Sequence, residues 1–88
     1  MSAPYVTLRN QLTELMRMGT GDVLSLRAWY DEAQRVMRFV RAQQLVVPPL
    51  VAQWLAGAEA RAKDPLLAAT QNGELANYLS TLPRSTES

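Results

Sequence analysis

The stretch from Ser25 to Gln44 constrains the fold most, because an apolar stripe and a basic stripe run along it at helical spacing. Apolar side chains recur here at steps of three and four residues, which places them on one face of a helix that turns about 100° per residue. This stripe consists of Leu26, Trp29, Ala33, Val36 and Val40. The spacing therefore predicts one long amphipathic helix that buries this face against other parts of the chain.

Two residues compete as the N-terminal cap of this central helix. Ser25 is preceded by one apolar residue and followed, four residues later, by another, which is the pattern of a hydrophobic staple around a hydroxyl cap. This pattern predicts a helix that begins at Leu26. Asp22 is the alternative cap, and it would start the helix at Val23. We prefer Ser25, because the staple adds an apolar contact to the cap.

The opposite face of the central helix is rich in arginine. It carries Arg27, Gln34, Arg38 and Arg41, with Arg35 at its edge. Asp31 and Glu32 lie four and three residues before Arg35, a spacing at which opposite charges on a helix meet and neutralise each other in part. Arg38 and Arg41 have no carboxylate at that spacing, so we expect their charges to be available to a partner.

The residues on either side of the central helix predict a preceding helix and a rigid elbow. Apolar spacing predicts the preceding helix from about Pro4 to Met18, with Gly19 as its left-handed C-terminal residue. The central helix should end between Gln43 and Val46, because a residue before proline avoids helical geometry. Pro48 and Pro49 then form the elbow, and a third helix can start directly from it.

The C-terminal half predicts further helical segments. The third helix is expected to extend through Gly57, with close packing at that glycine, and its small-residue face is attributed to the helix propensity of alanine. Asp64 and Pro65 read as the cap and first residue of a fourth helix. At Asn72–Gly73 the helix either breaks and restarts at Glu74 or runs through under strain to Leu82. We prefer the break, since this dipeptide favours turns, and expect the last segment to end before Pro83.

No part of the chain alternates long enough between apolar and polar residues to predict a strand. At 88 residues the chain has the length of one domain, and its apolar fraction of 48% suffices for a small core. The expected fold class is all-α, as a small compact bundle of three to five short helices spanning residues 1–88. Residues 1–3 and 83–88 are expected to be flexible tails.

Composition excludes several kinds of chemistry. The chain has no cysteine and no histidine, which removes thiolate metal sites, disulfides and the commonest general base. Its eight acidic residues are scattered, and its glycines form no phosphate-binding loop. We therefore expect no enzymatic activity, no cofactor, no metal and no small-molecule substrate.

Nothing in the sequence predicts a membrane protein or a secreted one. The first residues lack the basic and apolar regions of a secretory signal, and the longest apolar run, from Leu45 to Ala52, is much shorter than a membrane span. A cytoplasmic or particle-borne protein is expected.

These observations favour an interaction or assembly module, such as a small virion or adaptor component or an inhibitor of a larger complex. Charged residues make up only 19% of the chain, which suggests that another protein, or a second copy in a homo-oligomer, covers part of its surface. The expected contact surface comprises Arg35, Arg38, Phe39, Arg41, Val46, Val47 and Leu50.

Nucleic acid bound by the arginine stripe is the alternative. The net charge of +1 provides no broad attraction to phosphates, and the third helix carries little that could read base edges. Protein is therefore the preferred partner.

Overall fold

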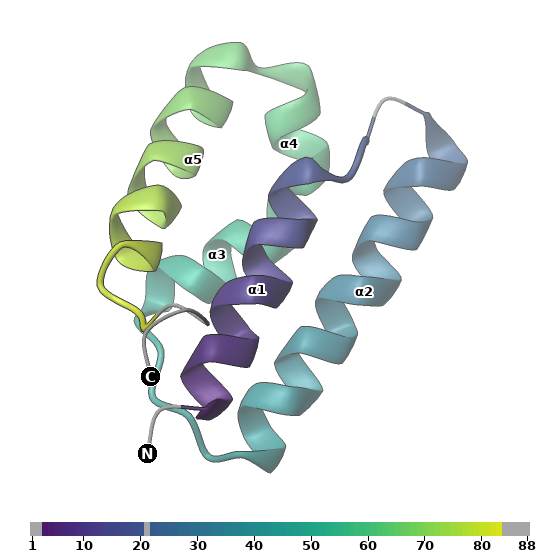
Figure 1. Cartoon of the computed structure of the whole chain (residues 1–88). Coiled ribbons are helices and arrows are strands. Elements are labelled where there is room, and N and C mark those ends of the chain that lie inside the picture. Colours follow the sequence, from purple (N-terminus) through teal and green to yellow (C-terminus); the bar gives the residue numbers. More distant parts are fainter. Residues whose placement is uncertain (1–2, 21, 84–88) are drawn as a thin grey trace.

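The computed structural model describes residues 3–20 and 22–83, which form helices and no strands. The five helices are α1 (Ala3–Arg17), α2 (Val23–Ala42), α3 (Pro49–Ala56), α4 (Ala58–Lys63) and α5 (Pro65–Leu79). The fold is thus the all-α bundle of short helices that the sequence predicts. Figure 1 shows α1 and α2 side by side and antiparallel, with α3 to α5 grouped beyond them.

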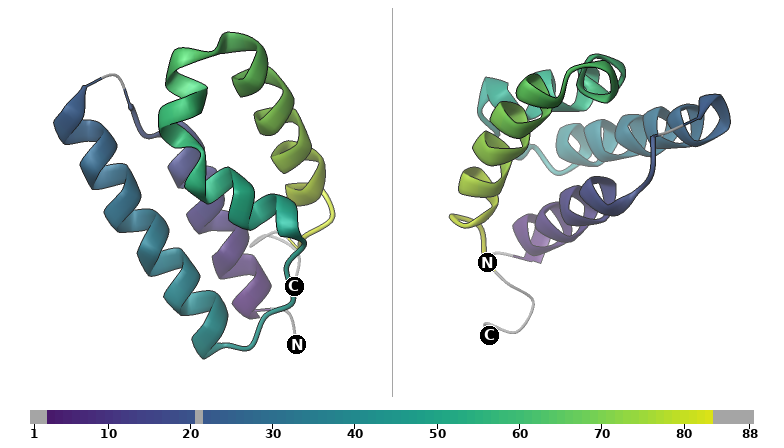
Figure 2. Two further views of the ribbon diagram at one scale, coloured as in Figure 1. Left: turned by 180° about the vertical axis from the view of Figure 1, so that it is seen from behind. Right: turned by 90° about the horizontal axis from the view of Figure 1, so that it is seen from above.

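The helices form two layers. One layer contains α1 and α2, and the other contains α3, α4 and α5, as the view from above in Figure 2 shows. Within the first layer the indole nitrogen of Trp29 donates to the backbone oxygen of Leu15 at 2.8 Å. Between the layers, Arg9 Nε donates to the backbone oxygen of Leu79 at 3.2 Å.

The core lies between these layers and is built from the predicted apolar faces. Its buried members are Leu8, Leu12, Leu15, Trp29, Ala33, Val36, Val40, Val51, Trp54, Leu55, Ala58, Leu75 and Leu79. The stripe predicted for the central helix is buried except for Leu26, which is half-buried and packs against the core. Helical periodicity therefore identified the buried face of α2 correctly.

The start of α2 differs from the preferred prediction, and Asp22 is the cap. Its Oδ1 accepts from the backbone nitrogen of Ser25 at 2.8 Å, and its Oδ2 accepts from the Ser25 hydroxyl at 3.2 Å. These bonds favour the carboxylate and lower the pKa of Asp22. The preference for Ser25 was wrong, because Leu24 is 77% exposed and makes no buried staple contact.

The left-handed residue also lies elsewhere than predicted. Gly19 does not have a positive φ angle, whereas Gln44 has a φ of 54°. Gln44 follows α2, and its backbone nitrogen donates to the backbone oxygen of Arg41 at 3.2 Å. The backbone nitrogen of Leu45 donates to the backbone oxygen of Val40 at 3.0 Å. This pair of bonds is a Schellman motif, which normally places glycine at the position of Gln44.

Gly57 separates α3 from α4 instead of lying inside one helix. Its backbone nitrogen donates to Trp54 at 3.2 Å and ends α3. A Cβ atom at Gly57 would lie 3.0 Å from Gln71 Oε1 and 3.1 Å from Arg61 Nη1. The close packing expected at this glycine is confirmed, while the continuous third helix was wrong.

The fourth predicted helix starts as expected but continues further. Asp64 Oδ1 accepts from the backbone nitrogens of Leu66 and Leu67 at 3.1 and 3.2 Å, which confirms the predicted cap. The break expected at Asn72–Gly73 was wrong, because α5 runs through it. Asn72 Oδ1 accepts from the indole nitrogen of Trp54 at 2.9 Å, so its side chain makes a tertiary contact instead of a local turn.

The expected tails lie mostly outside the described residues. Ala3 is the first residue of α1, and Pro83 is half-buried; the other residues of both tails are among those not described. No helix in the described ranges has the length and apolar character needed to cross a membrane.

Candidate functional site

The predicted contact residues differ in exposure. Four of them are exposed: Arg35, Arg38, Arg41 and Val46, the last at 82%. The others are half-buried and pack against the core, namely Phe39, Val47 and Leu50. Val47 and Leu50 of the elbow are therefore packed against the core, and the three arginines of α2 and Val46 remain accessible from this set.

Arg35 forms the local ion pair that its sequence neighbours predict. Its Nη1 lies 3.1 Å from Glu32 Oε2, and the arginine side chain is 69% exposed. An exposed pair of this kind adds little to stability. It nevertheless reduces the charge that Arg35 can offer to a partner.

An open groove runs between α2 and the α3–α4 pair, and it brings Arg38 and Arg41 to one rim. Its volume is about 700 Å³. It is lined by Tyr30, Ala33, Gln34, Met37, Arg38, Arg41, Ala52, Leu55, Ala56 and Glu59. No residue of α1 lines it, and the left view of Figure 2 shows α2 alongside α3 and α4 on this side of the molecule.

Small and apolar side chains form the floor of the groove. Ala33 comes from α2, whereas Ala52 and Ala56 come from α3, and alanine allows the backbone of another helix to approach closely. Met37 and Leu55 add apolar contact area, and methionine adapts its shape to different neighbours. This floor suits an apolar helical surface.

The two rims of the groove differ in charge. On the α2 rim, Arg38 and Arg41 are exposed and have no carboxylate within ion-pairing distance among residues 3–20 and 22–83. On the α4 rim, Glu59 Oε1 lies 3.2 Å from Lys63 Nζ, which compensates its charge. The groove therefore presents net positive charge along α2.

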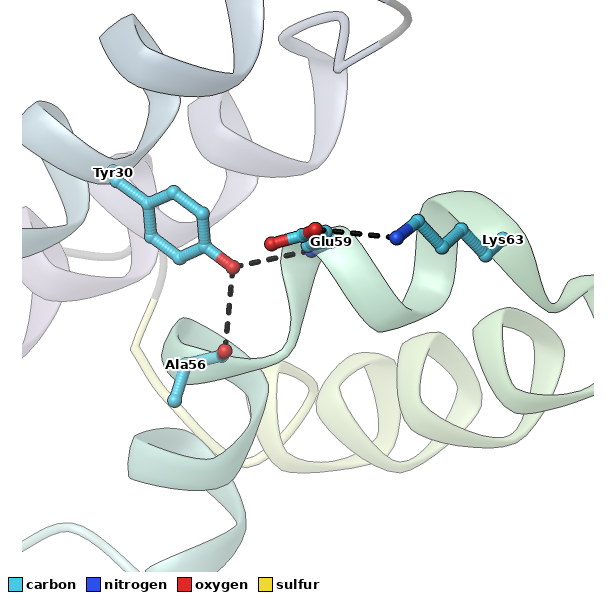
Figure 3. A network of polar contacts seen from close by, with 4 residues as sticks. All are labelled: Tyr30, Ala56, Glu59 and Lys63. Atoms are coloured by element: carbon cyan, nitrogen blue, oxygen red, sulfur yellow. Dashed lines mark hydrogen bonds and ion pairs between the residues drawn. The ribbon is translucent and has the colours of Figure 1, made fainter. Parts of the chain in front are cut away.

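Tyr30 fixes the two walls of the groove relative to each other. Its hydroxyl donates to the backbone oxygen of Ala56 at 3.3 Å and accepts from the backbone nitrogen of Glu59 at 3.1 Å. Figure 3 shows this phenol reaching from α2 to the junction of α3 and α4, beside the Glu59–Lys63 pair. The backbone groups on either side of Gly57 are thus hydrogen-bonded by a side chain of the facing helix α2.

The α3–α4 wall of the groove is absent from the predicted contact surface. Ala52, Ala56 and Glu59 recur at steps of four and three residues, so they share a face even across the interruption. The small-residue face of the predicted third helix was attributed to helix propensity except at Gly57, because a sequence does not show which helix lies opposite. The sequence feature that could have identified this wall is the pair of alanines, Ala52 and Ala56, followed at helical spacing by the charged Glu59.

The groove offers apolar contact area, two cations, a carboxylate and a phenol. No group of three or more acidic side chains that could hold a metal ion occurs in the described part of the chain. Comparison with protein-family models, with curated proteins and with solved structures finds no match to this chain.

Proposed function

We propose that this chain is a non-enzymatic interaction module that binds an amphipathic helix of a partner protein in the groove between α2 and the α3–α4 pair. The observation that carries the proposal is the combination of an apolar, alanine-rich floor with the Arg38–Arg41 rim. Binding of an amphipathic helix in an apolar groove is a recurring mode of peptide recognition.

Charge complementarity defines the partner further. Arg38 and Arg41 are three residues apart, so they lie about one turn from each other along the rim. A partner helix with acidic residues three or four apart beside its apolar face would pair with both arginines. The groove is open to solvent, which suits a helix better than a small molecule, whose binding usually requires enclosure.

A protein helix fits the groove better than nucleic acid does. The floor is apolar, whereas a phosphate backbone requires polar and cationic contacts along its path. The opposite rim carries the Glu59–Lys63 ion pair and adds no net positive charge, and the net charge of the chain is only +1. Only Arg38 and Arg41 would suit a protein helix and nucleic acid equally well.

Two designed helical peptides test this proposal directly. They share one leucine-rich face, and the residues beside it are glutamate in one peptide and lysine in the other. Titrated into the labelled protein and followed by backbone NMR, the glutamate peptide should shift the amides of the groove residues saturably. The lysine peptide should bind at least tenfold more weakly, because it would meet Arg38 and Arg41.

Three variants make the test specific. The double change Arg38→Glu, Arg41→Glu should reverse the preference between peptides, and Ala52→Leu should block the groove floor. Arg27→Glu is the matched control, since Arg27 is exposed on α2 but does not line the groove. Equal binding of both peptides, or unchanged binding to the Ala52→Leu variant, would contradict the proposal.

Two further outcomes would replace the proposed partner with another. Binding of a short DNA duplex at physiological salt, lost in the double arginine variant, would assign the rim to nucleic acid. A dimer in light scattering that Ala52→Leu dissociates would show that a second copy of the chain fills the groove.

A further inference from the structure

Arg61 is the buried charged side chain of the described residues. It lies on α4 with only 9% of its surface exposed. Its guanidinium carbon is 4.4 Å from the centroid of the Trp54 ring and 5.5 Å from that of Trp29. Two aromatic faces therefore accompany this cation inside the protein.

The hydrogen-bond partners of Arg61 are neutral. Its Nη1 donates to the backbone oxygen of Trp54 at 2.6 Å and to Gln71 Oε1 at 3.0 Å. In the described part of the chain no carboxylate lies within ion-pairing distance of Arg61. Burial lowers the pKa of this guanidinium, yet arginine stays protonated in proteins, so a full positive charge remains without an anion.

Part of the guanidinium is still available for hydrogen bonding. Arginine has five N–H groups, and Nη1 accounts for two of them. Among the described residues, Nε and Nη2 of Arg61 have no acceptor. Neither nitrogen is fully buried. These donors therefore keep contact with solvent.

Arg61 lines a hollow of about 150 Å³ to which all five helices contribute residues. Its lining residues are Leu15, Met16, Met18, Thr20, Trp29, Trp54, Ala58, Arg61, Ala62, Ala68 and Asn72. Asn72 Oδ1 accepts from Trp54, so the amide nitrogen of Asn72 is left as a donor, and the Thr20 hydroxyl is another. The hollow shares no lining residue with the groove.

We propose that this hollow binds a compact oxyanion, such as phosphate or a carboxylate, which pairs with the Arg61 guanidinium. Its volume of about 150 Å³ matches a ligand of roughly benzene size, which a phosphate or acetate ion does not exceed. The anion would supply the missing counter-charge through the remaining N–H groups of Arg61. Charge-assisted hydrogen bonds between a guanidinium and an oxyanion are among the strongest in proteins.

NMR of the two indole N–H groups tests the site, because Trp29 and Trp54 are the only tryptophans of the chain and both line the hollow. Inorganic phosphate, acetate and phosphoserine are titrated separately at constant ionic strength. At least one should give saturable shifts with single-site binding, together with a higher midpoint of thermal unfolding. Equal binding of phosphate and phosphoserine would indicate that the ion can be the end of a larger molecule, whereas binding of phosphate alone would indicate a free ion.

Variants separate binding at Arg61 from other effects. Arg61→Gln should weaken binding at least tenfold. Since that change can unfold the protein, Ala62→Leu provides a second route: Ala62 is exposed and lines the hollow, so leucine should obstruct it with the same loss of affinity. Ala60→Leu is the matched control, because Ala60 is exposed on the same helix and lines neither site.

Two results would overturn this inference. One is a linear, non-saturating response of the wild-type protein to all three anions. The other is equal affinity in the Ala62→Leu and Ala60→Leu variants. Neither result depends on whether a helix binds in the groove.

Discussion

Gln44 holds a backbone conformation that glycine adopts more easily. Its φ of 54° is left-handed, and its side chain is exposed. The Gln44→Gly change removes the steric cost of Cβ in this conformation but makes the unfolded chain more flexible. The net effect should be a rise of roughly 0.5–1 kcal/mol in the free energy of unfolding. We expect the midpoint of thermal unfolding, measured by circular dichroism, to rise by about 3–6 °C.

Gln43 provides the control for this prediction. It is also exposed, but its φ of −91° is accessible to every residue. Gln43→Gly should therefore lower the midpoint, because it adds only flexibility to the unfolded chain. A fall of similar size in both variants would contradict the assignment of strain to Gln44.

Single-residue signals predicted the caps of this protein in part. Asp64 was identified because a carboxylate followed by proline has one usual role. The left-handed conformation of Gln44 was not predicted, because glutamine has no preference for it. The direction that the chain takes after α2 determines this conformation. There the backbone nitrogen of Val46 donates to the hydroxyl of Tyr5 at 3.1 Å, a contact across 41 residues.

At the scale of elements, Tyr30 joins α2 to the junction of α3 and α4. Tyr30→Phe deletes both bonds of the hydroxyl and leaves the carbonyl of Ala56 and the N–H of Glu59 without this partner. We expect a loss of about 1 kcal/mol in urea unfolding, because both bonds are near solvent. Hydrogen exchange at the Glu59 amide should accelerate, while amides in the middle of α1 keep their relative protection. Unchanged protection of the Glu59 amide would contradict this role of Tyr30.

The sequence predicted the cap of α5 but not where the C-terminal helices are interrupted. It placed the interruption at Asn72–Gly73 and continuity at Gly57, and the structure has the reverse. Both differences arise from contacts between α3–α4 and α5, in which Asn72 bonds Trp54 and Gly57 lies against Gln71. Local propensities describe turns well, but they contain no information on such contacts between elements.

At the scale of the molecule, Tyr78 of α5 and Tyr5 of α1 lie near each other where the two layers meet. Burial raises the pKa of Tyr78, and Tyr5 raises it further. Because this pKa is higher in the folded state, its stabilising contribution is complete below the unfolded value of about 10 and is lost as the pH rises above it. The free energy of unfolding in urea should therefore fall as the pH rises above about 10.

Tyr78→Phe tests this origin of alkaline sensitivity. Phenylalanine has no ionisable group, so the variant should lose less stability than the wild type over the same pH range. Absorbance of ionised tyrosine, recorded in parallel, follows the titration itself. Identical pH profiles for the two proteins would exclude Tyr78 as the cause.

The candidate sites were predictable only to the extent that one helix contains them. Arg38 and Arg41 could be identified because the charge pattern of α2 leaves them without local acids. The facing wall of the groove requires the position of α3, and the hollow at Arg61 requires all five helices to converge. Arg61 did carry a signal, since it lies three residues after Ala58 and seven after Trp54, on the apolar face.

Helix α4 separates the groove from the hollow and contributes to both. Glu59 lines one side and Arg61 the other, while on α2 the adjacent residues Tyr30 and Trp29 line the groove and the hollow respectively. A shift of this six-residue helix that widens one site necessarily reshapes the other. A ligand that shifts α4 at one site would therefore change binding at the other, and thermodynamics would require this effect to be reciprocal: the factor by which an anion changes helix affinity would equal the factor by which the helix changes anion affinity.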